Sequence, residues 1–462
     1  MTYDAVILGS GPAGFEAARR IARNGRRTAL VTASPPGGRA TVGSLLPSKG
    51  WLHHAEHLST AADTDVADAA VLNAAAAIRT TIADRVAWTT AALENAGVEI
   101  VHGHGTVTGP NSIVVTSGDE EGTPRELTAS AIILATGSEP IFFPGVRPDG
   151  DRVIAPRHTQ NLSARPASMV MVGGGVTGVE YASVFARMGT RVHLLSLEPL
   201  LPRIDREYVA RLSDVLAELG VAAETGVAVR SVENTGSGVV VTTADDRRLE
   251  AEMAFIATGR AGDLTFLGDG APDLARTADG QFLAVDDEGR TSIPSIFACG
   301  DITGPPLTAT RAVLQGRRVA TAVANLISGD GDRTSGRGNT ARDTTAPETA
   351  TAGRTAAFIE AVYTDPQIAQ IGPVLELAER TDLTVTRQTY AGSMRAHAHR
   401  RTEGELRIWS DDAGSILGAA AFGELAAEVL APVQLAMHTG TRLGTLQEVP
   451  FAYPSVTEVV TM

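Results

Sequence analysis

The feature that most constrains this chain is a glycine-rich turn between an apolar run and a helical pattern. Residues 5–8 are Ala-Val-Ile-Leu, and Gly9, Gly11 and Gly14 follow with the spacing G-x-G-x-x-G. The first glycine permits a tight turn, the second lets the main chain approach a pyrophosphate, and the third lets helix and strand pack closely. The helix N-terminus adds an anion site. The pattern predicts the start of a doubly wound α/β sheet that binds a dinucleotide.

The same pattern occurs a second time along the chain. Gly173, Gly175 and Gly178 stand between a predicted strand over residues 169–172 and a predicted helix over 179–188. An internal repeat of this kind indicates two related structural units. We therefore expect two Rossmann-like nucleotide-binding domains in one chain.

Two later apolar runs, over residues 131–135 and 253–256, lead into the same tripeptide, Ala-Thr-Gly. We expect Thr136 and Gly137 in the first of these turns, and Gly259 in the second, to border the bound cofactors.

A third apolar segment, residues 296–299, ends in Gly-Asp. Asp301 at this place can bring a carboxylate to a ribityl hydroxyl of a flavin, although an acid here is also a common helix cap. The two fingerprints favour the cofactor role. Cys299 is the only cysteine, so the chain forms neither an intrachain disulfide nor a multi-cysteine metal site. We expect it to pack as a small buried hydrophobe.

The acid that commonly binds the ribose about 20 residues after the last glycine is missing at both strand ends. Thr32 and Ser196 each stand 18 residues after the last glycine of their fingerprint. A threonine hydroxyl binds a ribose more weakly than a charged acceptor does. Ser196 tolerates a 2′-phosphate, and Arg203 and Arg206 follow it, but these arginines are equally well explained as solvated charges. The choice between NADH and NADPH stays open.

Length and charge bound the remaining possibilities. A chain of 462 residues fits about three domains, and its net charge of −14 argues against a nucleic-acid surface. No apolar run approaches the ~20 residues of a membrane span, and the opening residues read as a first strand. We expect a cytoplasmic protein that does not enter a membrane.

Residues 328–354 are rich in Gly, Thr, Asp and Arg, which is typical of a flexible linker or surface loop.

With these motifs in place, the chain resembles the flavoprotein disulfide reductases, the family of dihydrolipoamide dehydrogenase and glutathione reductase. The resemblance covers nearly the whole length, and its motifs occur in the family order: Gly9–Gly14, Pro47-Ser48-Lys49, Ala135-Thr136-Gly137, Gly173–Gly178, Ala257-Thr258-Gly259-Arg260, Gly300-Asp301, Thr364-Asp365-Pro366 and Tyr453–Glu458.

This resemblance implies a discontinuous FAD-binding domain over residues 1–150 and 275–327, with Gly38 among its cofactor contacts. It implies an NAD(P)-binding domain over 151–274. After the linker over 328–354, it implies an α+β dimerisation domain over 355–462, so that the protein forms a homodimer.

The resemblance breaks at the redox motif Gly-Gly-Thr-Cys-x4-Cys-x-Pro-Ser-Lys. Ala40 and Leu45 stand where the family has its two cysteines. Thiol–disulfide exchange requires a thiolate, so the chain cannot follow the family route. The family motif His-Pro-x-x-x-Glu, which supplies a base from the partner subunit, begins here with Tyr453 and ends with Glu458. A tyrosine is a poor base near neutral pH, but it donates a hydrogen bond and offers a stacking surface.

Cysteine-less branches of the family include NAD(P)H:quinone reductases with the same Tyr-Pro-Ser ending, and the chain is most similar to those. We expect an enzyme that holds FAD, oxidises NAD(P)H and passes electrons to a small acceptor such as a quinone. The acceptor would stack in an apolar slot at Ala40 and Leu45, with Tyr453 as donor. Lys49 would lie near the flavin, unless it is a helix-terminal surface charge.

Two other functions fit the same motifs. One is a specialised biosynthetic flavin oxidoreductase that acts on a tailored organic substrate. The other is a non-catalytic dimeric relative, which the missing ribose acids favour. A metal site at His53 and His57, or at His397 and His399 on a predicted strand face, is a weaker hypothesis than solvated histidines, because no thiolate or carboxylate cluster accompanies either pair. We therefore expect no metal.

Overall fold

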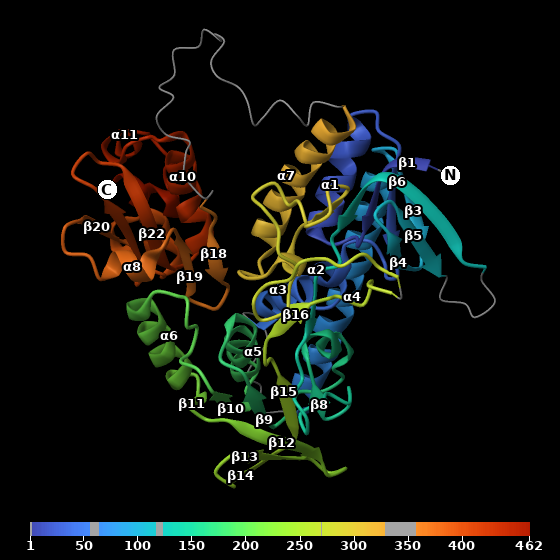
Figure 1. The fold of residues 1–462 in the computed structure, drawn as a ribbon. Helices are drawn as coiled ribbons and strands as arrows, with labels where there is room; N and C mark the ends of the chain where they lie inside the picture. The colour runs from blue at the N-terminus through green and yellow to red at the C-terminus, as the bar shows by residue number, and fades with distance from the viewer. Residues whose placement is uncertain (1, 56–63, 117–122, 269, 329–356) are drawn as a thin grey trace.

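The computed structural model describes residues 2–55, 64–116, 123–268, 270–328 and 357–462. These residues form three sheet-based units, which Figure 1 shows in colours running from blue to red. The predicted linker over 328–354 falls almost entirely outside the described residues.

The first unit is built on a seven-stranded sheet. Its strands are β1 (Thr2–Leu8), β2 (Thr28–Thr32), β3 (Val98–His102), β4 (His104–Gly109), β5 (Ser112–Thr116), β6 (Arg125–Leu134) and β17 (Ile296–Ala298). Its helices are α1 (Pro12–Arg23), α2 (Gly38–Val42), α3 (Leu45–Ala55), α4 (Thr64–Glu94), α7 (Ala309–Ile327) and the 3-10 helix η2 (Asp301–Thr303).

The central strand β1 pairs in parallel with β2 on one side and β6 on the other, and β17 adds to β6 from far along the chain. Alternate β1 residues face opposite sides of the sheet. Ala5 and Ile7 pack under α1 and α7, whereas Val6 and Leu8 join the core on the other face. Both faces are therefore covered, as expected of a parallel sheet.

The second unit repeats this arrangement. Its parallel sheet has the order β11-β10-β9-β15-β8, and a three-stranded antiparallel sheet, β12-β13-β14, lies beside it. The strands are β8 (Val153–Ile154), β9 (Ser168–Val172), β10 (Arg191–Ser196), β11 (Ala222–Thr225), β12 (Val229–Asn234), β13 (Val239–Thr243), β14 (Arg248–Ala251) and β15 (Met253–Ile256). The helices are α5 (Val176–Arg187), α6 (Arg206–Glu218) and the 3-10 helix η1 (Pro156–Asn161).

A small antiparallel pair joins the first two units. Strand β7 (Ser138–Pro140) follows the first Ala-Thr-Gly turn, and β16 (Arg260–Gly262) follows the second. This pairing places both turns at the crossing between the units.

The third unit is an antiparallel sheet with the order β18-β19-β22-β21-β20. Its strands are β18 (Glu360–Val362), β19 (Gln367–Ile371), β20 (Thr384–Thr389), β21 (Glu405–Ser410) and β22 (Ile416–Gly423). Its helices are α8 (Val374–Ala378), α9 (Met394–His399), α10 (Ala426–Thr439), α11 (Leu443–Gln447) and the 3-10 helices η4 (Tyr390–Gly392) and η5 (Val456–Thr461). Helix α10 buries Val429, Leu430 and Val433 against one sheet face.

The prediction that His397 and His399 alternate on a strand is wrong. They lie on the short helix α9, which begins because the Ser393 hydroxyl accepts a hydrogen bond from the Ala396 N–H. His399 pairs with Glu424, and His397 contacts the Ala391 carbonyl. Among the described residues, no group of three or more His, Cys, Asp or Glu side chains could hold a metal ion.

Helix α4 is long and apolar enough to cross a membrane by length and composition alone, over Asp65–Glu94, and 28% of its most apolar window is buried inside the protein. Its residues Val71, Ile78 and Ile82 pack in one core cluster with Trp51 of α3. The same signal arises from a core helix of a soluble protein, so it is weak evidence for membrane insertion.

Candidate cofactor sites and active site

The first glycine turn connects β1 to α1, and its three glycines have two different structural roles. A Cβ added at Gly9, whose φ is +103°, would collide with the Ala135 carbonyl, and a Cβ at Gly14 would collide with the Gly9 carbonyl. A Cβ at Gly11 would meet nothing within 4 Å. Gly11 is the N-cap of α1 and has no side-chain cap. The turn therefore leaves open space at a helix N-terminus, which fits the pyrophosphate of a dinucleotide.

The second turn, between β9 and α5, has the same geometry. Gly173, with φ +117°, lies against the Ala257 carbonyl, and Gly178 lies against the Gly173 carbonyl. The Cβ direction of Gly175 is again open to 4 Å. Gly38 differs from these six glycines, because a Cβ there would lie 2.7 Å from the Gly11 Cα. It brings the start of α2 close to the first turn.

The residues at the two ribose positions use their hydroxyls within the chain. Thr32 Oγ1 donates to the Ser34 carbonyl at 2.8 Å and lies 2.8 Å from Ser10 Oγ. Ser196 Oγ donates to the Glu198 carbonyl at 2.6 Å. Both side chains are about 5% exposed or less. Each hydroxyl proton is therefore committed to a main-chain oxygen two residues further on, which leaves only acceptor capacity for a ribose.

Asp301 is joined to the first Ala-Thr-Gly turn rather than used as a helix cap. Its Oδ2 accepts a hydrogen bond from Ser138 Oγ at 2.6 Å, and Arg260 Nε donates to the same hydroxyl at 2.8 Å. Burial lowers the pKa of Arg260, and the Asp301 carboxylate opposes this shift. Sequence reasoning missed Ser138 and Arg260. Both residues directly follow an Ala-Thr-Gly motif, and this position could have identified them from the sequence.

The turn residues themselves lie at the crossing between the two units. Thr136 Oγ1 donates to the Asp263 carbonyl at 2.9 Å, which ties the first turn to the segment after β16. Gly137 and Gly259 have φ of +81° and +105°, and an added Cβ would meet nothing within 4 Å at either. Both turns therefore need the left-handed backbone region that glycine favours.

Lys49 links all three units. Its Nζ lies 2.8 and 2.7 Å from the two carboxylate oxygens of Glu180 on α5. The Glu180 side chain is 3% exposed and also accepts the Tyr363 N–H at 3.0 Å. Lys49 Nζ lies 4.5 Å from the centre of the Tyr363 ring. Lys49 is therefore a fixed, half-buried cation rather than a surface charge. Sequence reasoning assigned no role to Glu180 or Tyr363.

The segment that replaces the redox motif carries no sulfur. Ala40 lies on α2, and Leu45 begins α3 with 40% of its surface exposed. Cys299 directly follows β17 and is fully buried, and desolvation raises the pKa of its thiol to about 12. Arg39, which sequence reasoning did not single out, forms an ion pair with Glu139, and burial lowers the pKa of its guanidinium to about 10.

The two residues of the C-terminal pair, Tyr453 and Glu458, differ in exposure. Tyr453 is 71% exposed. Glu458 is 6% exposed; its Oε1 accepts the Met394 N–H at 2.9 Å, and its Oε2 has no hydrogen-bond partner among the described residues. No hydrogen bond joins Tyr453 to Lys49 or to Glu458 in the described part of the chain. Their shared role in one site stays a prediction that requires a second subunit.

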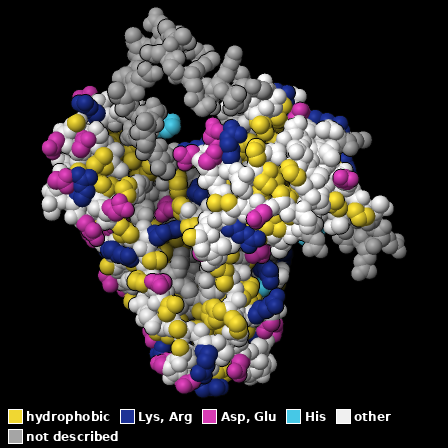
Figure 2. Space-filling view, in the orientation of Figure 1, with side chains coloured by type: hydrophobic (Ala, Val, Ile, Leu, Met, Phe, Trp, Pro, Cys, Tyr) yellow, Lys and Arg dark blue, Asp and Glu magenta, His cyan; other side chains and the backbone are white. Residues whose placement is uncertain are grey.

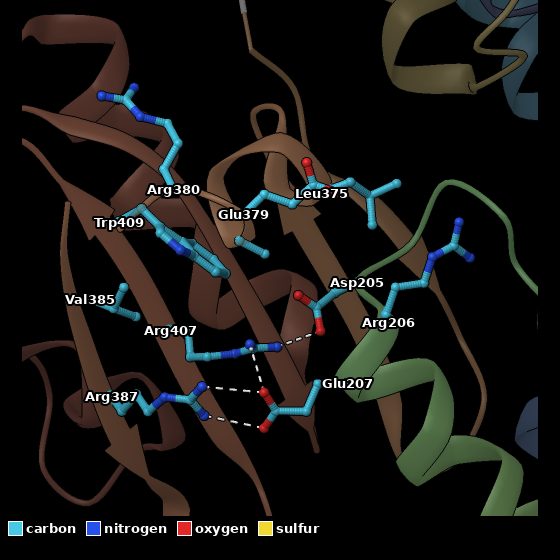
Figure 3. A pocket seen from close by; sticks show the side chains of 11 residues that line it. Asp205, Arg206, Glu207, Leu375, Glu379, Arg380, Val385, Arg387, Arg407 and Trp409 are labelled. Atoms are coloured by element: carbon cyan, nitrogen blue, oxygen red, sulfur yellow. Dashed lines mark hydrogen bonds and ion pairs between the residues drawn. The ribbon is translucent and has the colours of Figure 1, made fainter. Parts of the chain in front are cut away.

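A separate cavity of about 450 Å³ lies between α6 and the C-terminal sheet (Figure 3). Arg206 lines it, but none of the other residues considered for the cofactor sites or the active site does. Arg407 of β21 lines this cavity. Its guanidinium forms an ion pair with Asp205 and lies 3.0 Å from a Glu207 oxygen. This polar cluster connects the second unit to the third.

On the face shown in Figure 2, positive and negative side chains are interspersed over all three units.

Comparison with known proteins agrees with this arrangement. The family described as pyridine nucleotide-disulphide oxidoreductase matches residues 3–316, and its dimerisation domain matches 359–462. The chain is 30% identical to dihydrolipoyl dehydrogenase of Chlorobaculum tepidum, over 99% of this chain and 95% of that protein. It is 29% identical to NAD(P)H dehydrogenase (quinone) of Mycobacterium tuberculosis, over 99% of this chain and 92% of that protein.

Among solved structures, LpdA from Mycobacterium tuberculosis superposes with a TM-score of 0.84 at 26% identity, covering 99% of this chain and 98% of that one. The predicted fold class is confirmed, and so are FAD and NAD(P)H as the cofactors. The domain boundaries and the roles of single site residues stay predictions. The chain belongs to the pyridine nucleotide-disulphide oxidoreductase family and lacks the cysteine pair of its redox motif.

Proposed function

We propose that this protein is an NAD(P)H-dependent flavin oxidoreductase that passes electrons to a small acceptor such as a quinone, without disulfide chemistry. One observation carries the proposal. The Lys49–Glu180 pair and both glycine turns are formed, whereas Ala40 and Leu45 occupy the cysteine positions. The relative named NAD(P)H dehydrogenase (quinone) supports this acceptor class.

FAD, when bound, supplies the two-electron redox chemistry. The chain's own residues position it. The main chain at Gly11 and the α1 N-terminus would bind its pyrophosphate, and Asp301, held by Ser138, would accept from a ribityl hydroxyl. Gly175 and the α5 N-terminus would do the same for NAD(P)H.

The acceptor would lie on the apolar surface of Ala40 and Leu45. We infer a homodimer in which Tyr453 of one subunit faces this surface of the other, because the dimerisation domain is present and Tyr453 is 71% exposed. Its hydroxyl would donate a hydrogen bond to a carbonyl of the acceptor. A cytoplasmic location stays part of the proposal.

The test is a two-stage anaerobic reaction of FAD-loaded protein. NADH or NADPH is expected to bleach the flavin absorbance, and menadione is expected to restore it, whereas lipoamide and glutathione disulfide are not. Leu45→Glu should raise KM for menadione at least tenfold without slowing flavin reduction, because it places a charge against an apolar acceptor. Leu72→Glu is the matched control, since Leu72 is a comparably exposed apolar residue on α4. Rapid reduction of lipoamide by the wild type would contradict the proposal.

A second candidate is a non-catalytic dimeric relative. The hydroxyls of Thr32 and Ser196 are both committed within the chain, which favours weak cofactor binding. An absorbance spectrum decides between the two. Purified protein that shows no flavin bands, even after incubation with FAD, would favour this candidate over the enzyme.

A further inference from the structure

The strand that ends at Ser196 is followed by an acid that occupies the expected distance from the glycine turn. Glu198 lies 20 residues after Gly178, which is about the spacing at which an acid binds the adenosine ribose in dinucleotide-binding folds. The segment that contains it returns to the turn. The Leu201 N–H donates to the Gly174 carbonyl at 2.9 Å, and the Leu200 side chain lies beside Gly174. The segment that begins at Glu198 therefore contacts the second glycine turn.

The Glu198 carboxylate is available to a ligand. The side chain is exposed, and no hydrogen bond or ion pair of its carboxylate occurs with the described residues. Its main chain, in contrast, is fixed, because its carbonyl accepts the Ser196 hydroxyl at 2.6 Å. The buried Ser196 thus anchors the main chain of the residue that carries the charge.

The two arginines downstream are engaged elsewhere. Arg203 is 3.9 Å from Glu360 of β18, in the third unit. Arg206 donates to the Pro202 carbonyl at 2.9 Å, and Figure 3 shows it on the first turn of α6, beside the C-terminal sheet. A 2′-phosphate placed beside Glu198 would meet its carboxylate, and like charges at short range repel. A ribose diol would instead find a charged acceptor, which binds hydroxyls strongly.

We propose that Glu198 accepts hydrogen bonds from the adenosine ribose hydroxyls of the nicotinamide cofactor and thereby selects NADH over NADPH. The proposal rests on the NAD(P)H site and not on the identity of the electron acceptor. Glu198 is a specificity-determining residue at the far end of the cofactor from the nicotinamide ring.

Redox-inert fragments test this independently of turnover. FAD-loaded protein is titrated calorimetrically with ADP-ribose and with 2′-phospho-ADP-ribose, and the ratio of the two Kd values is measured. We expect the wild type to prefer ADP-ribose at least tenfold. Glu198→Gln should reduce that preference severalfold, and Glu198→Lys should reverse it, while flavin content stays unchanged. Glu218→Gln, an exposed acid at the other end of α6, should leave the ratio unaltered.

A wild type that prefers the 2′-phosphorylated fragment would overturn the proposal, and so would an unchanged ratio in Glu198→Lys. Arg203→Ala and Arg206→Ala test the alternative that a nearby arginine binds the 2′-phosphate of NADPH. If either variant selectively weakens the 2′-phosphorylated fragment, the arginines rather than Glu198 determine the choice. Failure of quinone reduction would leave these Kd values, and hence this inference, unaffected.

Discussion

At the scale of single residues, Lys49 supplies the only cation within 4 Å of the Glu180 carboxylate among the described residues. Glu180 is 3% exposed, and its carboxylate contacts this partner and the Tyr363 N–H. Removing one member of a buried pair leaves an uncompensated charge, which costs more than the net contribution of the pair itself. The pair therefore restricts what can replace either residue.

We expect Lys49→Met to lower the free energy of unfolding by about 3 kcal/mol, at the low end for a broken buried pair because the Lys49 side chain is 27% exposed. Adding Glu180→Gln should restore most of the loss, since the orphaned charge disappears. Urea denaturation of the four proteins of this double-mutant cycle measures the effect. Equal stability of Lys49→Met and wild type would contradict the ion pair.

The residues that could be predicted are those whose role depends on neighbours in the sequence. The collision at Gly14 involves the Gly9 carbonyl within one strand–turn–helix unit, so the glycine spacing alone could predict it. The collision at Gly9 involves the Ala135 carbonyl on a distant segment, and the spacing predicts only the tight turn there. The hydrogen bond between Ser138 and Asp301 joins positions 163 residues apart, and no local pattern carries it. The proposed role of Glu198 does not follow from the usual pattern for a different reason: this acid stands two positions beyond the last residue of β10.

At the scale of elements, helix α6 and strand β21 illustrate how the second and third units are joined. Asp205 caps α6 by accepting the Tyr208 N–H at 3.0 Å, and the same carboxylate receives Arg407 from the third unit. The Arg407 and Asp205 side chains are 4% and 2% exposed. Helix α9 was predicted as a strand because two histidines alternate there, whereas the Ser393 hydroxyl caps a helix at this place.

Arg407→Met should destabilise the protein by about 3–5 kcal/mol, because it leaves the buried Asp205 carboxylate without its cation. Arg380→Met is the matched control on the rim of the same cavity. Arg380 pairs with Asp382 at 3.0 Å, but these side chains are 47% and 65% exposed, so its loss should shift the unfolding temperature far less than the loss of Arg407. Thermal unfolding followed by circular dichroism compares them. Similar shifts in the two variants would show that the cluster is not a buried connection.

At the scale of the whole molecule, the proposed active site is incomplete in one chain. Ala40 and Leu45 come from the first unit, Lys49 from the same helix as Leu45, and Tyr453 from the third unit, where it is exposed. Fold and cofactors could be predicted from the sequence because the motifs repeat at fixed spacing. The identity of the acceptor could not, because the proposed acceptor surface would be formed by two subunits and is defined mainly by the two cysteines that the chain lacks.

That loss can be reversed to test how much of the reaction it decides. We expect Ala40→Cys with Leu45→Cys to introduce two thiols into the segment without changing flavin content, since both replaced side chains are small or partly exposed. Thiol–disulfide exchange also requires a base that removes the thiol proton, and Tyr453 is a poor base near neutral pH. Lipoamide reduction should therefore stay low in the double variant and rise at least tenfold when Tyr453→His is added. Tyr453→His alone should gain none of this activity. Full lipoamide activity in the double variant would mean that Tyr453 does not limit the chemistry, and equal failure of all variants would place the barrier outside these three positions.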